Sequence, residues 1–330
     1  MKNAGGLPQD GRQPEVQSLF ITLWDLSLPT LGKEEAGKKV QPRSVEFPLV
    51  AAGAQLWVRA EGAAEWTLGP VAEAEVLDVD EDTQRVPPTV VDIAALLPSV
   101  KGNRFEIGVE PGALQGVQFG GYYESEESYV PMRDAQRLVA VVQWGTAQWT
   151  EMYEAFADCS NMQITATDVP DLARCGSLHS AFMGSGVEEG FAGWNVGSVV
   201  DMNAMFYGCS RFVGKSLAEW DVRNVESMAM MFMECENFDG KLGRWNVANV
   251  QDFTSVFSGC SAFRGRGVER WQVQEEAERE GAFDGCFSLL EGQPAWMGET
   301  DEGDEGRYED DEAERGERVR KFRPNAAADD

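Results

Sequence analysis

The second half of the chain repeats one pattern of apolar positions about every 25 residues. In five of six copies a tryptophan stands twelve residues before a phenylalanine, and a cysteine follows that phenylalanine three residues later. The remaining copy has Pro170 in place of the tryptophan. The aromatic positions are Trp144, Trp194, Trp220, Trp245, Trp271, Phe156, Phe182, Phe206, Phe232, Phe257 and Phe283. A period of this length predicts stacked repeats whose aromatic side chains form a shared core.

Within each repeat the apolar positions predict a short helix. Apolar side chains stand five, eight and twelve residues after the tryptophan, as at Val225, Met228 and Phe232. Steps of three and four residues place side chains on one helix face. Asn224 is a suitable N-cap, and Gly208 stands where a left-handed residue would end the helix before it. Alternation around each tryptophan predicts a short strand. We therefore predict an α+β solenoid of about six coils, each with one short strand and one short helix.

The first half shows a different pattern. Residues 16–133 contain short apolar runs separated by turn-forming residues. Phe105, Ile107 and Val109 alternate with Glu106 and Gly108, as a half-exposed strand requires. The number and spacing of these runs predict a small β-sandwich-like domain.

Composition sets the remaining boundaries. Residues 1–15 are rich in Gly, Pro and polar side chains and are predicted to be disordered. The repeats occupy residues 134–290, and the last of them has Glu276 and Arg279 at positions that are apolar elsewhere, which predicts a terminal cap. Residues 291–330 are rich in Asp and Glu and are predicted to form an acidic disordered tail.

One recurring line of sequence carries a family resemblance. It reads Trp220-Asp-Val-Arg-Asn-Val-Glu-Ser-Met-Ala-Met-Met-Phe-Met-Glu-Cys235, with copies that begin at Trp194 and Trp245. This repeat resembles the BspA-type leucine-rich-repeat surface proteins, and the likeness covers about residues 134–290. The resemblance implies a leucine-rich-repeat solenoid, an immunoglobulin-like or PKD-like domain ahead of it, and a secreted or cell-surface protein that binds host or matrix proteins or other cells.

The charge of the chain excludes some classes of partner. The 330 residues carry a formal net charge of −28, from 28 Lys and Arg against 56 Asp and Glu. Such a surface repels a phosphate polyanion, so no nucleic-acid binding is expected. No stretch approaches the roughly 20 apolar residues that span a bilayer, so no membrane insertion is expected. The sequence also shows no signal peptide, and a cytoplasmic location is therefore the alternative to the surface location that the resemblance implies.

Five of the six cysteines occupy one phase of the repeat. They are Cys159, Cys209, Cys235, Cys260 and Cys286. Ser185 replaces the cysteine in one copy, so a small side chain suffices there. Equivalent side chains in a stack point the same way, which disfavours disulfides, and no two cysteines have the C-x₂-C spacing of a metal site. We predict a ladder of buried free thiols, with disulfides and metal ligation as less favoured alternatives, and no metal or cofactor.

The sequence offers no catalytic motif. His179 is the single histidine, it falls on an outward position, and no G-x-S-x-G element accompanies it. No phosphate-binding glycine motif occurs either. We therefore predict no catalytic residues and a protein that is not an enzyme.

Candidate binding residues flank the tryptophans on the outward strand face. They are Glu219, Asp221, Arg244, Asn246, Arg270 and Asn195. Their charges vary while the inward residues do not, and exposed faces of repeat arrays are usual binding surfaces. A merely solvated face is the alternative. The tryptophans themselves could stack on sugars, but their fixed phase favours a role in the core.

The predicted function is a non-enzymatic protein-binding or adhesion module that presents its repeat face to a protein or cell-surface ligand. An intracellular scaffold or assembly protein is one alternative, because the sequence shows no export signal. A parallel β-helix enzyme acting on polysaccharide is a weaker alternative, since the acidic positions do not recur in register to form the required carboxylate pair.

Overall fold

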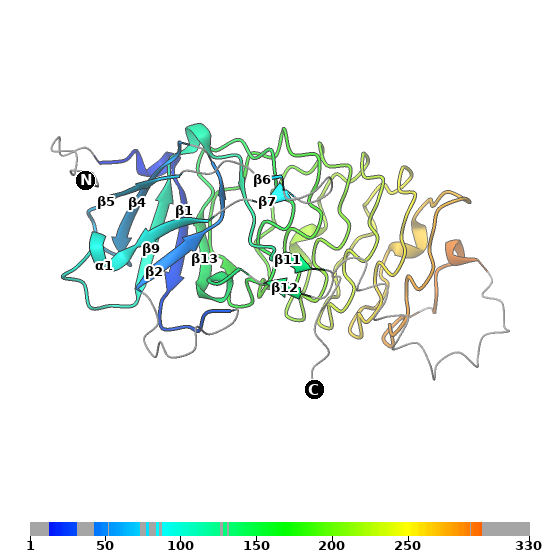
Figure 1. Ribbon diagram of the computed structural model, residues 1–330. Helices are drawn as coiled ribbons and strands as arrows, with labels where there is room; N and C mark the ends of the chain where they lie inside the picture. The colour runs from blue at the N-terminus through cyan, green and yellow to red at the C-terminus, as the bar shows by residue number, and fades with distance from the viewer. Residues whose placement is uncertain are drawn as a thin grey trace.

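The computed structural model of the chain describes residues 13–31, 43–51, 53–72, 77–78, 84–85, 88–125, 128–130, 132–290 and 292–298. A β-rich N-terminal part lies at one end, and a row of stacked loops extends from it (Figure 1). The predicted disordered N-terminus and acidic tail lie outside the described residues, apart from residues 13–15 and 292–298.

An open six-stranded sheet forms the centre of the N-terminal part, with the strand order β14-β13-β1-β9-β4-β5. Its strands are β1 (Phe20–Asp25), β4 (Gln55–Ala60), β5 (Thr67–Val71), β9 (Arg104–Val109), β13 (Leu138–Gln143) and β14 (Gln163–Ile164). Neighbouring strands are antiparallel except for the parallel pair β13 and β14. Because β13 and β14 belong to the start of the repeats, the sheet continues directly into the first repeat.

Shorter elements accompany this sheet in the described part of the chain. Two-stranded sheets join β2 (Ser44–Phe47) to β8 (Thr89–Asp92), β3 (Leu49–Val50) to β10 (Gly116–Val117), β6 (Leu77–Asp78) to β7 (Gln84–Arg85), and β11 (Tyr122–Ser125) to β12 (Ser128–Val130). Helix α1 (Ile93–Leu96) is a single turn, and 3-10 helices span Val16–Ser18, Pro111–Ala113, Ala135–Arg137, Lys215–Leu217, Val268–Arg270 and Ala295–Met297. One open sheet with two-stranded additions thus stands where a β-sandwich-like domain was predicted.

The hydrophobic core runs unbroken from the sheet into the repeats. Phe20 of β1 stacks on Trp144 with ring centroids 5.8 Å apart, and Phe119 stacks on Phe156 at 6.2 Å. These contacts cross the predicted domain boundary between residues 133 and 134. The sheet therefore covers the N-terminal end of the repeat core.

A buried ion pair holds the same junction. Asp134 and Arg137 have fully buried side chains, and Arg137 Nη1 lies 3.0 Å from Asp134 Oδ1. Asp134 also accepts hydrogen bonds from the Glu46 amide at 2.8 Å and from Arg133 Nε at 2.9 Å. Arg137 Nε donates to the Leu28 carbonyl at 3.0 Å. Burial lowers the pKa of Arg137, while Asp134 opposes that shift. The pair ties strand β2 and the segment after β1 to the start of β13.

Each repeat turns sharply in the segment that was predicted to be helical. In the third repeat the amides of Met205, Tyr207 and Cys209 donate to the carbonyl groups three residues earlier, at 3.3, 3.0 and 3.0 Å. Ala204 and Gly208 have positive φ angles of 51° and 71°. An α-helix needs φ near −63° at every residue, so this backbone excludes one.

Two left-handed positions recur through the array, two residues before and two residues after the phenylalanine. The first set is Glu154, Ser180, Ala204, Met230, Ser255 and Gly281. The second set is Asp158, Gly184, Gly208, Glu234, Gly259 and Gly285. Residues other than glycine rarely adopt positive φ, so their repetition shows that the stack imposes this conformation.

The amides between the turn-forming ones bond to the next repeat. Those of Met202, Ala204, Phe206 and Gly208 donate to the carbonyl groups of Ser227, Ala229, Met231 and Met233 at 3.0, 2.8, 2.9 and 2.8 Å. Isolated parallel bridges connect Ser177, Asp201, Ser227, Asp252 and Glu278 from one repeat to the next. Successive amides therefore donate in alternation to a carbonyl group within the turn and to one in the neighbouring repeat. This hydrogen-bond pattern belongs to neither an α-helix nor a β-strand.

The predicted fold class, α+β with a leucine-rich-repeat solenoid, is wrong. The described part of residues 144–298 contains no α-helix, and its one named strand is β14. The segment around Trp220, predicted as a strand from Leu217 to Val222, starts at the end of a 3-10 helix (Lys215–Leu217) and contains no strand. Asn224, predicted as a helix cap, instead donates through Nδ2 to the Gly197 carbonyl of the preceding repeat at 2.7 Å. Apolar residues three and four positions apart lie on one side of a helix, but they also lie on one side of consecutive tight turns. The spacing of the apolar positions therefore could not distinguish the two structures.

Aromatic columns fill the interior of the stack. Phe206 stacks on Phe232 at 5.8 Å, and Phe232 stacks on Phe257 at 5.6 Å, with interplanar angles of 6° and 4°. Trp245 stacks on Trp271 at 6.3 Å and 2°. A third column, of Phe212, Phe238 and Phe263, lies beside the column that contains Phe206. All eleven aromatic residues of the predicted core are buried.

Candidate functional site

The six predicted binding residues are all exposed and form two rows across the repeats. Glu219, Arg244 and Arg270 make up the row before the tryptophans. Asn195, Asp221 and Asn246 make up the row after them. The two rows differ in what their side chains do.

Side chains of the second row hold the backbone. The side-chain oxygens of Asn195, Asp221 and Asn246 accept hydrogen bonds from the amides two residues later, at 3.2, 3.3 and 3.2 Å. Short polar side chains often close a turn in this way. Their recurrence is therefore explained by local structure, which leaves the first row as the stronger candidate for a ligand.

The first row lines a shallow hollow of about 430 Å³. Its charged lining residues are Glu219, Lys241, Arg244, Arg266 and Arg270. Arg244 Nη1 pairs with Glu219 of the neighbouring repeat. The hollow thus spans three consecutive repeats.

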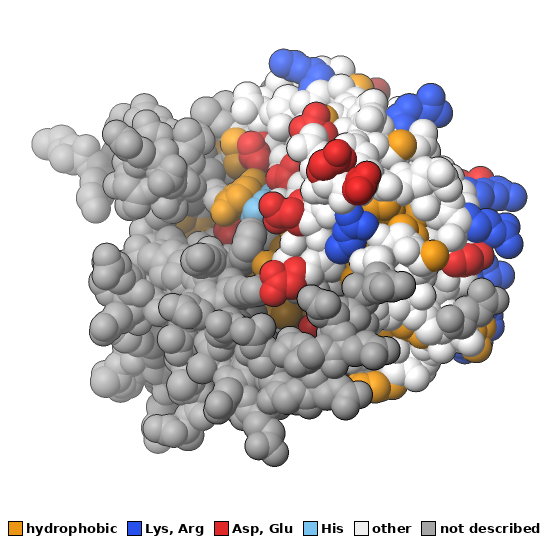
Figure 2. All heavy atoms as spheres, turned by 90° about the vertical axis from the view of Figure 1, so that its right-hand side faces the viewer, with side chains coloured by type: hydrophobic (Ala, Val, Ile, Leu, Met, Phe, Trp, Pro, Cys, Tyr) orange, Lys and Arg blue, Asp and Glu red, His pale blue; other side chains and the backbone are white. Residues whose placement is uncertain are grey.

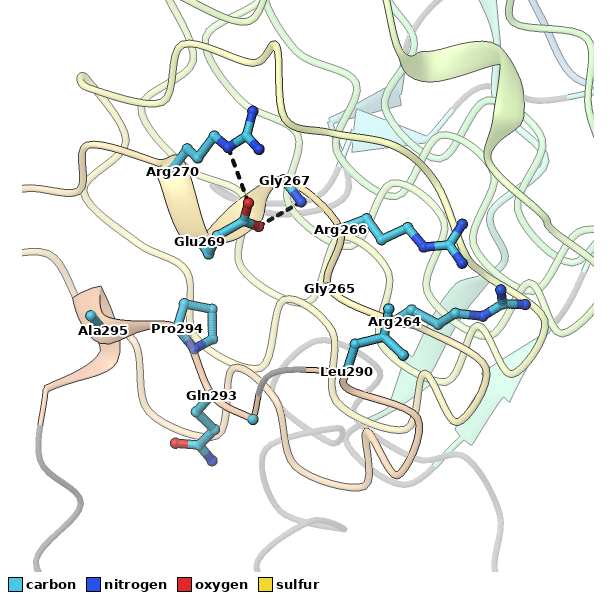
Figure 3. Close-up of a pocket in the computed structure, with 11 residues that line it drawn as sticks. Arg264, Gly265, Arg266, Gly267, Glu269, Arg270, Leu290, Gln293, Pro294 and Ala295 are labelled. Carbon is cyan, nitrogen blue, oxygen red and sulfur yellow. Dashed lines mark hydrogen bonds and ion pairs between the residues drawn. The ribbon is translucent and has the colours of Figure 1, made fainter.

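A second hollow, of about 450 Å³, lies beside it and shares Arg266 and Arg270. Figure 3 shows the guanidinium groups of Arg264 and Arg266 pointing the same way, with Leu290 beside Arg264 and with Pro294 and Ala295 on the opposite side. The Glu269 carboxylate pairs with Arg270, whose Nε lies 3.1 Å from Glu269 Oε1. The same carboxylate accepts a hydrogen bond from the Gly267 amide at 2.6 Å. The lining is therefore mixed, with apolar side chains such as Leu290 and Pro294 and cationic side chains such as Arg264 and Arg266.

A close backbone approach forms the floor between these repeats. Gly267 has a φ of 94°, and a Cβ placed there would lie 2.5 Å from the Cα of Gly243. Such a contact is too short for any side chain. Glycine at both positions lets the two repeats approach, and this keeps the hollow open at the surface.

Positive charge predominates around the two hollows. Lys241, Arg244, Arg264, Arg266 and Arg270, here called the basic surface, are all exposed. Within the described part of the chain, Arg244, Arg264 and Arg270 pair with Glu219, Asp239 and Glu269, whereas Lys241 and Arg266 have no ion pair. In the view down this end, Lys and Arg side chains gather along one edge and Asp and Glu lie nearer the centre (Figure 2). A local excess of cations on a chain of net charge −28 favours an anionic partner.

Sequence reasoning identified Arg244 and Arg270 but missed the other three cations. Lys241 and Arg266 stand 25 residues apart, and Arg264-Gly-Arg-Gly267 precedes a tryptophan, so the repeat spacing carried a usable signal. It also missed Trp296, which stands 25 residues after Trp271 and stacks on it at 6.0 Å. The aromatic column therefore extends beyond the predicted end at residue 290.

Residues 176–296 match the family model described as "Mycoplasma protein of unknown function, DUF285". The match includes the whole basic surface. Neither a curated protein nor a solved structure shows significant similarity to the chain. In the described residues, no helix has the length and apolar character needed to cross a membrane.

The cysteine column is buried and free of disulfides. The sulfur atoms of Cys209, Cys235, Cys260 and Cys286 lie 2.9, 2.9, 2.9 and 3.0 Å from the carbonyl oxygen of the phenylalanine in the preceding repeat. Each thiol therefore faces a backbone acceptor. Burial raises the pKa of Cys159, Cys235 and Cys260 well above the ordinary value and that of Cys286 to about 12. Such thiols are poor nucleophiles, because the thiolate is the reactive form.

His179, Ser177 and Asp201 lie together, although not as a hydrolytic triad. His179 Nδ1 is 3.5 Å from Asp201 Oδ2, and Ser177 Oγ donates to the same oxygen at 2.9 Å. Burial raises the pKa of Asp201, but the hydrogen bonds it accepts outweigh that effect and lower it. In a triad the imidazole lies between hydroxyl and carboxylate, whereas here both groups bind the carboxylate. This cluster links two repeats.

The described part of the chain holds no group of three potential metal ligands.

Proposed function

We propose that the chain is a non-enzymatic binding module that docks acidic groups of a protein or cell-surface ligand on its basic surface. The observation that carries this proposal is the pair of adjoining hollows with five exposed cations on two consecutive repeats. Arg244 and Glu219 pair across neighbouring repeats, so the basic surface forms only when the repeats are stacked.

The charges support an anionic partner. Lys241 and Arg266 are exposed and have no ion pair with a described residue, so they can bind carboxylates without losing an existing contact. Exposed pairs such as Arg244 with Glu219 are worth at most about 1 kcal/mol and can rearrange on binding. A cationic surface on an otherwise acidic chain also orients an approaching acidic partner.

Rigidity is the second support. The floor of the surface is fixed by the contact between Gly243 and Gly267 and by the aromatic columns beneath. A surface that does not need ordering loses less entropy on binding. The lining of Leu290 and Pro294 adds apolar area beside the cations.

A location at the cell surface forms part of the proposal. It follows from the resemblance of the repeats to BspA-type surface proteins, while the matched family description names no activity. An intracellular scaffold is the second candidate. Fractionation of native cells separates them, because the proposal requires the protein in the surface or secreted fraction.

Charge reversal tests the basic surface. Lys241→Glu combined with Arg266→Glu is compared with Lys101→Glu combined with Arg174→Glu, which changes the net charge equally at exposed sites elsewhere. Binding to cells, to matrix proteins and to poly-L-glutamate is measured by biolayer interferometry. We expect at least about a tenfold loss, or 1.4 kcal/mol, for the first variant only. Equal binding by both variants would show that this surface is not the site.

A further inference from the structure

The last repeat ends the backbone ladder with a row of unpaired amides. In the fifth repeat, Phe253, Ser255, Phe257 and Gly259 donate to the carbonyl groups of Glu278, Glu280, Ala282 and Asp284 at 2.7, 2.8, 2.9 and 2.7 Å. The equivalent amides of the sixth repeat are those of Arg279, Gly281, Phe283 and Gly285. Within the described part of the chain none of these four has an acceptor. This edge therefore offers four hydrogen-bond donors in a row.

Acidic and apolar side chains surround that edge. Glu275, Glu276, Glu278 and Asp284 are exposed, and none has an ion pair with a described residue. Phe287 is 89% exposed. Arg279 forms no ion pair with these carboxylates in the described part of the chain, because its guanidinium binds the carbonyl groups of Gln274, Ala277 and Trp296. The edge requires a partner with carbonyl acceptors, cationic side chains and some apolar area.

One segment of the chain outside the described residues fits these needs. Residues 315–323 read Arg315-Gly-Glu-Arg-Val-Arg-Lys-Phe-Arg323, with five basic side chains and one acidic. We infer that this segment docks along the edge of the sixth repeat in an extended conformation. Its carbonyl groups accept from the four amides, its Arg and Lys side chains meet the carboxylates, and Val319 and Phe322 add apolar contacts beside Phe287.

The connection is long enough for docking within one chain. Sixteen residues, 299–314, separate Gly298 from the segment, and a chain of that length reaches at most about 53–58 Å when fully extended. The tether starts near the edge, because the Trp296 ring lies 5.6 Å from Phe283. A short tether gives an effective concentration in the range of about 1 mM, so weak contacts suffice.

Charge and hydrogen bonding disfavour other occupants. Residues 299–314 hold ten acidic side chains and one arginine, so the acidic edge repels them. The same edge of a second copy offers only donors and the same negative charge. The inferred contact is independent of the proposed binding function, since it uses other residues and the opposite charge.

Amide exchange tests the contact most directly. The full chain is compared by NMR with a chain that ends at residue 314 and one that ends at Gly298. We expect exchange at Arg279, Gly281, Phe283 and Gly285 to be at least about tenfold slower in the full chain, and similar in the two shorter ones. Equal exchange in all three chains would overturn the inference.

A full-length variant and a cross-link guard against effects of truncation. Arg318→Glu, Arg320→Glu and Lys321→Glu together are expected to speed exchange as truncation does, whereas Lys101→Glu with Arg174→Glu is not. A carbodiimide should join Lys321 to Glu278 or Asp284 within one chain. In a mixture of isotopically light and heavy protein, cross-links found only between chains would assign the edge to a second copy and contradict docking within one chain.

Discussion

Exchanging serine and glycine between equivalent positions of two repeats tests the left-handed turns. Ser255 and Gly281 both stand two residues before the phenylalanine, with φ angles of 54° and 64°. In the predicted helix this position would be interior. For each of the substitutions Ser255→Gly and Gly281→Ser, the expected change in the free energy of unfolding therefore has one sign in a left-handed turn and the opposite sign in a helix.

The magnitude follows from the backbone. A left-handed conformation costs an L-residue roughly 1–2 kcal/mol, and glycine loses about 0.4–1 kcal/mol more entropy on folding. Ser255→Gly should therefore stabilise the fold by about 0.5–1 kcal/mol, whereas in a helix interior it would destabilise by about 0.5 kcal/mol. Gly281→Ser should destabilise by a similar amount or more, because its Cβ would lie 3.1 Å from Ser255 Oγ.

Urea unfolding followed by tryptophan fluorescence and circular dichroism measures both variants, with coincident transitions as the check on two-state behaviour. Thermal unfolding of the same two variants should shift Tm by about 1–4 °C in opposite directions. A destabilised Ser255→Gly protein, or a stabilised Gly281→Ser protein, would refute the turn conformation.

Three further predictions concern the core, the junction and the thiols. Phe232→Ala removes a ring stacked on both sides and should cost about 3–5 kcal/mol in urea unfolding; a loss under 1 kcal/mol would contradict the continuous column. Asp134→Ala leaves Arg137 buried without its partner and should cost about 3–5 kcal/mol, whereas an unchanged midpoint would contradict the buried pair. Burial raises the pKa of Cys175 to about 11. The contribution of the buried neutral thiol to folding stability is therefore complete below the unfolded thiol pKa of about 8.5, and it is lost as the pH rises toward 11. Native protein at pH 8 should therefore resist iodoacetamide, and rapid labelling would contradict burial.

The sequence was most informative where one side chain type recurred in phase. The spacing of Trp220, Phe232 and Cys235 placed their side chains in a common interior, because only inward positions must stay constant between repeats. The same spacing could not reveal the backbone conformation. Left-handed residues such as Ala204 and Met230 have no sequence signature, and the neighbouring repeat imposes their geometry through hydrogen bonds.

The candidate site was only partly predictable for a related reason. Arg244 and Arg270 flank tryptophans, so the period located them. Lys241 and Arg266 lie in two successive loops between repeats. Their position beside each other depends on the close contact of Gly243 with Gly267, which joins these two loops. Contacts between loops arise only once the stack is formed.

The central structural claim is that alternate amides of each repeat bond to the next repeat. Scalar couplings across hydrogen bonds, measured by NMR on deuterated protein, report donor and acceptor directly. We predict couplings from the Ala204, Phe206 and Gly208 amides to the Ala229, Met231 and Met233 carbonyl groups. Couplings from these amides to carbonyl groups four residues earlier would instead reveal a helix and contradict the stack of turns.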